Sequence, residues 1–155
     1  MRIIVCMKQV PAGTNVEIDP ETGAMKRMSG ETRTNPYDLF ALETALRIRE
    51  SLGGTVTVLT MGPAQAEEMM RDAYTMGMQG IQVIGGADLI IGGRQTTDGD
   101  TAQVGPAIAE HMGIPHAAWV AEIVKADEHA ITVRQDLASV TQVSEIPYPC
   151  LITVD

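Results

Sequence analysis

Continuous apolar segments alternate with amphipathic segments along the first two thirds of the chain. Ile3–Met7, Thr55–Met61 and Ala87–Ile91 are runs of apolar or β-branched residues, a pattern typical of parallel strands buried on both faces. In 36–52 and 66–76, apolar residues recur every three or four positions, which predicts helices with one buried face. The order strand, helix, strand, helix, strand indicates an α/β domain.

Residues at the segment ends support the helix predictions. Asn35 is suited to the N-cap, and Pro36 suits the first helical position, where a missing N–H is harmless. Asp38 follows in the first turn, near the positive end of the helix dipole. A third helix is expected over 104–112, because its apolar residues share one face and Gly113 is a typical stop.

The last third of the chain changes character. I-T-V-R-Q-D, S-V-T-Q-V-S and C-L-I-T-V-D are three strand-like pieces separated by polar turns, which predicts an antiparallel edge on a mostly parallel sheet. Near the N-terminus, V-E-I-D-P-E-T-G-A-M-K-R alternates around a turn at Asp19–Gly23 and predicts a small hairpin or loop. We expect one domain over 1–155.

Composition narrows the class of protein. With 155 residues, 45% hydrophobic and 3% aromatic, the core must be aliphatic, and the ten methionines are best read as core filler. A net charge of −9 argues against a nucleic-acid or anionic-membrane partner. Cys6 and Cys150 are expected to be free thiols. No signal peptide or membrane-length apolar run is visible, so a cytoplasmic location is expected.

Residues 87–106 contain more glycine, polar and charged residues than a plain turn requires. Their sequence is A-D-L-I-I-G-G-R-Q-T-T-D-G-D-T-A-Q-V-G-P. Gly92 and Gly93 permit close approach of the backbone, and Arg94 can pair with a phosphate through two donors. The following helix start offers N–H groups to an anion. Asp98 and Asp100 suit a cap or hydrogen bonds to a ribose. An ordinary polar loop with a cap explains these residues equally well.

Other kinds of site find little support. The chain has neither G-x-x-x-x-G-K-[ST] nor G-x-G-x-x-G after a strand, which excludes the usual phosphate-loop and dinucleotide signatures. Its three histidines lack metal-ligand spacing. Asp98-x-Asp100 is more often a cap than a Mg²⁺ site. Ser139 and Ser144 have no neighbouring base, so no catalytic residue is predicted.

Five motifs in order resemble the β subunits of electron transfer flavoproteins. They are K-Q-V-P, N-P-Y-D-L-F-A-L-E-T-A-L-R-I-R-E, T-M-G-P-A-Q-A, D-A-Y-T-M-G-M and D-L-I-I-G-G-R-Q-T-T-D-G-D-T-A-Q-V-G-P. The resemblance implies a doubly wound, Rossmann-like α/β fold that binds an adenine nucleotide, with antiparallel C-terminal strands. It also implies a heterodimer with an α subunit that carries the electron-transferring FAD.

The resemblance leaves the nucleotide open. Many family members hold a structural AMP, whereas electron-bifurcating members hold a second FAD that exchanges hydride with NADH. The stretch R-Q-T-T-D-G-D-T-A-Q-V-G-P looks more like the bifurcating type. Implied redox partners are dehydrogenases of the acyl-CoA type, ferredoxin or flavodoxin. The rival reading is an adenine-nucleotide-binding module of the stress-protein type, without a redox role.

The residues that match the family's nucleotide contacts come from four places in the chain. They are Cys6, by its main chain, and Lys8 after the first strand; Asn35, Pro36, Tyr37 and Asp38 at the first helix; Met61, by its main chain, after the second strand; and Gly93, Arg94, Gln95, Thr96, Thr97, Asp98, Gly99, Asp100, Thr101, Ala102, Gln103 and Val104.

Two departures from the family pattern shape further expectations. Relatives carry a longer segment where Met78 meets Gln79, so we expect a flavin-side segment to be absent there. Relatives also continue beyond Asp155 into an arm that wraps the α subunit. We therefore expect this chain to bind an α subunit more weakly than longer relatives do.

Overall fold

The computed structural model describes residues 1–13, 20–21, 31–61, 66–76 and 87–155. The hairpin predicted over 16–27 lies outside the described residues apart from Pro20 and Glu21. The predicted interruption between Met78 and Gln79 also lies outside them.

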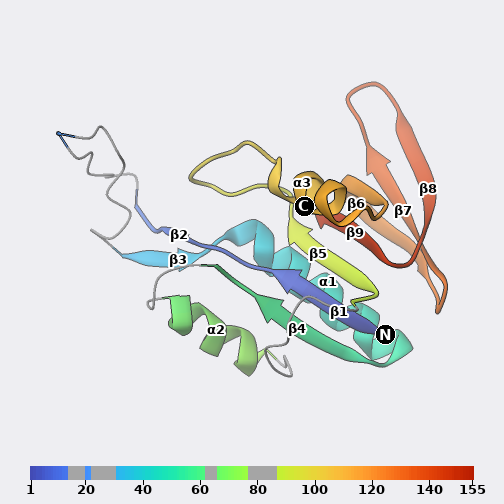
Figure 1. The fold of residues 1–155 in the computed structure, drawn as a ribbon, viewed down its shortest axis with the longest axis horizontal. Helices are drawn as coiled ribbons and strands as arrows, with labels where there is room; N and C mark the ends of the chain where they lie inside the picture. The colour runs from blue at the N-terminus through green and yellow to red at the C-terminus, as the bar shows by residue number, and fades with distance from the viewer. Residues whose placement is uncertain (14–19, 22–30, 62–65, 77–86) are drawn as a thin grey trace.

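A seven-stranded sheet forms the centre of the molecule (Figure 1). Its strands follow the order β4-β1-β5-β9-β6-β7-β8, of which the first five run parallel and the last three pair antiparallel. Their bounds are β1 (Arg2–Cys6), β4 (Thr55–Leu59), β5 (Leu89–Gly93), β6 (His116–Ala126), β7 (Ala130–Asp136), β8 (Thr141–Pro147) and β9 (Cys150–Val154). A separate two-stranded pair joins β2 (Gln9–Pro11) to β3 (Thr32–Thr34).

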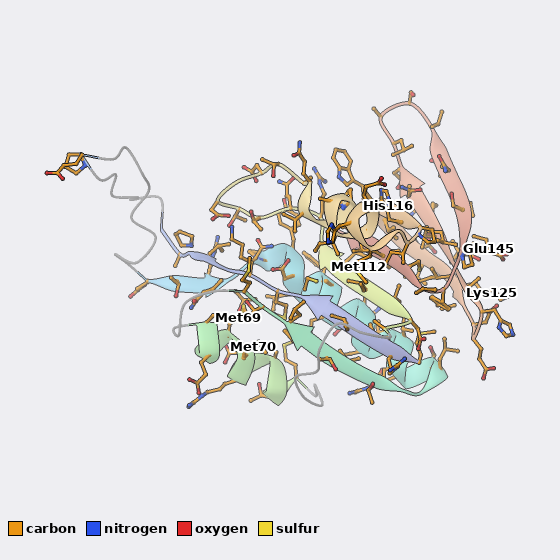
Figure 2. The ribbon with its side chains drawn as sticks, in the orientation of Figure 1. Met69, Met70, Met112, His116, Lys125 and Glu145 are labelled. Carbon is orange, nitrogen blue, oxygen red and sulfur yellow. The ribbon has the colours of Figure 1, made fainter. Side chains whose placement is uncertain are left out.

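Helices cover both faces of the parallel part of the sheet. Successive side chains of β1 point to opposite faces: Ile3 belongs to an apolar cluster with α1 (Pro36–Leu52), and Ile4 to a second cluster with α3 (Val104–Met112). The remaining helix, α2 (Ala66–Thr75), adds two nearly buried methionines, Met69 and Met70, to the first cluster (Figure 2).

The predicted doubly wound α/β fold is confirmed. The runs at Ile3–Met7, Thr55–Met61 and Ala87–Ile91 are β1, β4 and β5, shifted by at most two residues at each end. The three predicted helices are present, and Gly113 ends α3 in the left-handed conformation with φ 65°. No helix among the described residues is long and apolar enough to cross a membrane.

Two features differ from the sequence expectation. The last strand, β9, is not part of the antiparallel edge; it inserts between β5 and β6, parallel to both. All five of its residues are buried, because a central strand needs two apolar faces. The short β2–β3 pair was also not predicted, since three residues are too few to show a periodicity.

Candidate functional site

The carboxyl ends of the parallel strands bring three predicted segments together. β1 pairs with β4 on one side and with β5 on the other, so the chain reverses its winding direction at β1. Such a switch point leaves a crevice where ligands bind in α/β proteins. The segments after β1 and β5 meet the start of α1 here, and they form the site described below.

Asp38 is a buried carboxylate at the centre of these segments. Only 5% of the residue is exposed. Its Oδ2 accepts a hydrogen bond from the Lys8 main-chain N–H at 2.7 Å, and Gly93 N–H also donates to the carboxylate. Its Oδ1 accepts from Asn35 Nδ2 at 2.9 Å. Asp38 therefore ties the ends of β1 and β5 to the first turn of α1.

Asn35 occupies the N-cap position of α1, as predicted, but its side chain does not cap the helix. The amide instead donates from Nδ2 to the carbonyl of Gln95 at 2.8 Å, and its Oδ1 accepts from Thr97 N–H at 3.3 Å. The predicted side-chain cap is thus wrong. The segment after β5 approaches the start of α1 closely, and its main chain forms hydrogen bonds with the Asn35 side chain, which a helix cap would have used.

Gly93 allows this close approach. A Cβ at Gly93 would collide with the Asp38 carboxylate, and it would lie 2.6 Å from the carbonyl carbon of Tyr37. No side chain fits between the end of β5 and the first turn of α1, which explains why the sequence has glycine at this position.

Lys8 and Asp98 form an ion pair across the mouth of the site. Lys8 Nζ lies 2.7 Å and 2.8 Å from the two carboxylate oxygens of Asp98. Asp98 belongs to a turn in which Gly99 and Asp100 donate their N–H groups to the carbonyl of Thr96. The contact with Lys8 lowers the pKa of Asp98 in spite of the cost of burying it, so this carboxylate is ionised at neutral pH.

The segment between this turn and α3 has an unusual backbone. Asp100 and Ala102 have positive φ values of 48° and 54°, a conformation that is unfavourable for residues with a Cβ. Such outliers cluster at functional sites. The segment leads to Gln103 and Val104 at the start of α3, where Gln103 makes no side-chain cap, and it carries Thr101 on its exposed part.

Arg94 points away from the aspartates of its own loop. Its Nη1 lies 3.2 Å from each carboxylate oxygen of Asp155, and its guanidinium carbon lies 4.6 Å from the centre of the Trp119 ring. Trp119 has a positive φ of 61° within a bulge of β6. The sequence analysis predicted neither Asp155 nor Trp119 as a partner of Arg94. The single tryptophan of the chain could have been considered as a stacking partner for an arginine.

The other predicted residues lie at the edges of the site. Cys6 ends β1, and burial, with a smaller effect from Asp38, raises the pKa of its thiol to about 11, so it stays neutral. Pro36 and Tyr37 are half-buried at the start of α1. Met61 follows β4 but is 98% exposed, and the structure does not bring its side chain into the cluster.

Two buried polar atoms at this end of the sheet have no partner among the described residues, Thr60 Oγ1 after β4 and Arg94 Nε after β5, and a third, Tyr148 OH, precedes β9 at the other end. Unpaired buried groups are rare in folded proteins and call for a partner. No group of three or more potential metal-ligating side chains occurs in the described part of the chain.

The burial of Asp38 predicts a pH dependence of stability. Burial raises its pKa from 3.8 to about 6, although Lys8, Asn35 and Gly93 act in the opposite direction. The folded protein then holds this proton more tightly than the unfolded chain does. We expect the free energy of unfolding to increase by roughly 1.3 kcal/mol as the pH falls from 7 to 5.

Denaturant unfolding of the wild type and of Asp38→Asn at both pH values tests this. A carboxylate whose pKa is lowered by folding, such as Asp98, stabilises the folded protein until the pH falls close to its ordinary pKa. That pH lies below 5, so such groups do not cause a change between pH 7 and 5. An increase of the same size in Asp38→Asn would show that another group is responsible.

Comparison with known proteins identifies the family to which this chain is related. The electron transfer flavoprotein domain matches residues 22–85 and 78–155. The protein FixA of Sinorhizobium fredii is 40% identical over 184 residues, covering 99% of this chain and 65% of that protein. The caffeyl-CoA reductase–Etf complex subunit CarD of Acetobacterium woodii is 40% identical, covering 99% and 68%. The electron transfer flavoprotein subunit beta of Clostridium acetobutylicum is 38% identical, with the same coverage.

The chain spans about two thirds of the length of these relatives. The alignment with FixA, at 184 residues, is longer than the 155 residues of this chain, so that relative carries residues within the aligned region that this chain lacks. The two family matches overlap at 78–85, the stretch in which the interruption is predicted, and the interruption itself stays a prediction. On the family match and these identities, the chain belongs to the electron transfer flavoprotein family and is of the β-subunit type.

Proposed function

We propose that this chain binds an adenine nucleotide, FAD in preference to AMP, at the carboxyl ends of β1, β4 and β5. In this role it passes electrons between a donor, NADH or a dehydrogenase, and the FAD of an α subunit in a cytoplasmic heterodimer. The observation that carries the proposal is the convergence of three segments on the buried Asn35 and Asp38 at the switch point of the sheet.

The residues present fit a nucleotide held largely by the main chain. The site's cations are already neutralised, Lys8 by Asp98 and Arg94 by Asp155, so a phosphate would have to compete for them. Main-chain N–H groups at the start of α3 are a further attraction for an anion, and within the described part of the chain the Gln103 side chain does not cap them. Thr60 Oγ1 and Arg94 Nε offer further polar groups without partners among the described residues.

The division of work follows from this arrangement. When bound, the flavin supplies the redox chemistry, and the protein holds it and sets the charge around it. A nucleotide that displaces Asp98 or Asp155 would gain Lys8 or Arg94 as a counter-ion, and the 93–104 segment would orient it. This division agrees with the absence of a predicted acid–base catalyst.

Absorption spectroscopy of the chain after incubation with FAD and removal of the excess tests the proposal. Retained flavin gives bands at about 370 and 450 nm, and added AMP should release it by competing for the same site. Retention of AMP but not of FAD would favour the stress-protein type of binding module. Retention of neither nucleotide would contradict the proposed function.

Arg94→Ala is expected to weaken FAD binding by about tenfold to a hundredfold, because a charge-assisted contact is worth about 1.5–3 kcal/mol. It should also lower the flavin potential, since a cation near the ring favours the reduced form. Arg47→Ala is the matched control: Arg47 is exposed on α1 and pairs with Glu43. Wild-type affinity and potential in Arg94→Ala would mean that Arg94 does not act on the nucleotide.

A further inference from the structure

Asn35 and Asp38 occupy the centre of the site, yet they are closed to solvent. The exposed fractions are 0% for Asn35 and 5% for Asp38, and main-chain or side-chain partners already use their polar atoms. A ligand in the crevice meets the segments that these two side chains hold. It does not need to meet the side chains themselves.

We infer that Asn35 and Asp38 are positioning residues: they hold the segments after β1 and β5 in place above the start of α1, and they contact no bound nucleotide. The effect on affinity rests on the proposed function, whereas the effect on the two segments does not. The family resemblance implies that these residues contact the nucleotide, and the inference gives them a different role.

Asp38 links the ends of the neighbouring strands β1 and β5. The Asp38 carboxylate receives the N–H groups of Lys8 after β1 and Gly93 at the end of β5. The Asn35 main chain adds a second contact to the same place, because its N–H donates to the Lys8 carbonyl at 2.9 Å. Both strand ends are therefore bound to one helix start.

Asn35 links the start of α1 to the rest of the segment after β5. Asn35 holds this segment at Gln95 and Thr97, residues 60 and 62 positions away in the sequence. Because Asn35 Nδ2 also donates to Asp38 Oδ1 at 2.9 Å, a shift of one side chain displaces the other. The Asp98 turn and its ion pair with Lys8 lie on segments that are both held in this way.

The charge on Asp38 affects this arrangement. The ionised carboxylate accepts all three donors, whereas the protonated acid, or the amide of Asp38→Asn, presents a donor of its own. The charged group acting on Asp38 is Lys8, which Asp98 neutralises, and Cys6 stays a neutral thiol. Among the described groups in this cluster, Asp38 is the one that changes charge between pH 7 and 5.

Hydrogen exchange in the nucleotide-free chain tests the positioning. In Asp38→Asn, we expect the amides of Lys8, Gly93 and Thr97 to exchange about tenfold faster or more, which corresponds to losing about 1.4 kcal/mol of local protection. Asp88→Asn is the matched control, because Asp88 Oδ2 accepts from Arg2 N–H at 2.7 Å and links the same two strands at the opposite end of the sheet. Its effect should be confined to Arg2.

FAD affinity provides the second readout. Asp38→Asn should lower it about tenfold or more, and Asp88→Asn should leave it unchanged. Wild-type affinity should fall between pH 7 and 5, where the FAD pyrophosphate keeps its charge, and the fall should be absent in Asp38→Asn. Where Asp38→Asn does not fold, Asn35→Ala provides the measurement: because Asn35 Oδ1 accepts from Thr97 N–H, Thr97 should exchange about tenfold faster, and unchanged exchange would overturn the inference.

The outcomes separate the inference from the proposed function. A loss of affinity without faster exchange in Asp38→Asn would identify a direct contact and overturn the inference. An equal loss in Asp88→Asn would show general destabilisation and overturn it too. A wild type that binds neither FAD nor AMP would contradict the proposed function. Hydrogen exchange at Lys8, Gly93 and Thr97 would then be the remaining test of the positioning role.

Discussion

Gly93→Ala is expected to lower the free energy of unfolding by about 3 kcal/mol and to abolish retention of FAD. The new Cβ would collide with the Asp38 carboxylate and lie 2.6 Å from the Tyr37 carbonyl carbon and 2.8 Å from the Asp38 nitrogen. Two of these three atoms belong to the main chain of α1, so a rotamer change cannot relieve the contact. Either β5 or the start of α1 must move.

Gly99→Ala is the control for this prediction. Gly99 lies in the same segment, but a Cβ there would meet only Thr96 Oγ1, at 3.4 Å, and the position is exposed. Denaturant unfolding should stay near the wild-type value in this variant. A Gly93→Ala protein as stable as Gly99→Ala would show that β5 and α1 do not approach as closely as described.

Asn35→Ala is expected to lower the free energy of unfolding by about 2 to 3 kcal/mol. A side-chain cap alone is worth about 1 kcal/mol. The loss should be greater here because the variant leaves the Gln95 carbonyl and the Thr97 N–H without their partner and removes a donor to Asp38. Denaturant unfolding distinguishes these two magnitudes.

Gln142→Ala serves as the comparison for a lost amide. Gln142 donates from Nε2 to Ser144 Oγ at 2.9 Å on an exposed part of β8, so its removal should change stability by less than about 0.5 kcal/mol. A loss of only about 1 kcal/mol in Asn35→Ala would return Asn35 to the role of an ordinary cap.

Much of the fold could be predicted because its signals are local. The apolar runs of β1, β4 and β5 and the periodicity of α1 are visible within short windows, and hydrophobic burial follows those windows. The segment 93–104 was likewise identified as the main loop from its own glycines, arginine and aspartates. The structure confirms that this segment lies at the carboxyl end of β5.

The partners of the site residues could not be predicted in the same way. Side chains of Asn, Asp and Arg can bind many different groups, and the local sequence does not choose among them. Asn35 was expected to cap its own helix but binds the distant Gln95. Arg94 was expected to face a phosphate, yet its Nη1 pairs with Asp155.

The α/β class, the approximate ends of the strands and helices, the loop that leads into α3 and the family resemblance all follow from the amino-acid sequence. The position of β9 between β5 and β6 and the link that Asp38 makes between Lys8 and Gly93 are visible only in the folded chain. The physical reason is that secondary structure follows from the periodicity of neighbouring residues. Strand order and buried hydrogen bonds depend on which distant segments can be packed together without a clash or an unpaired polar group.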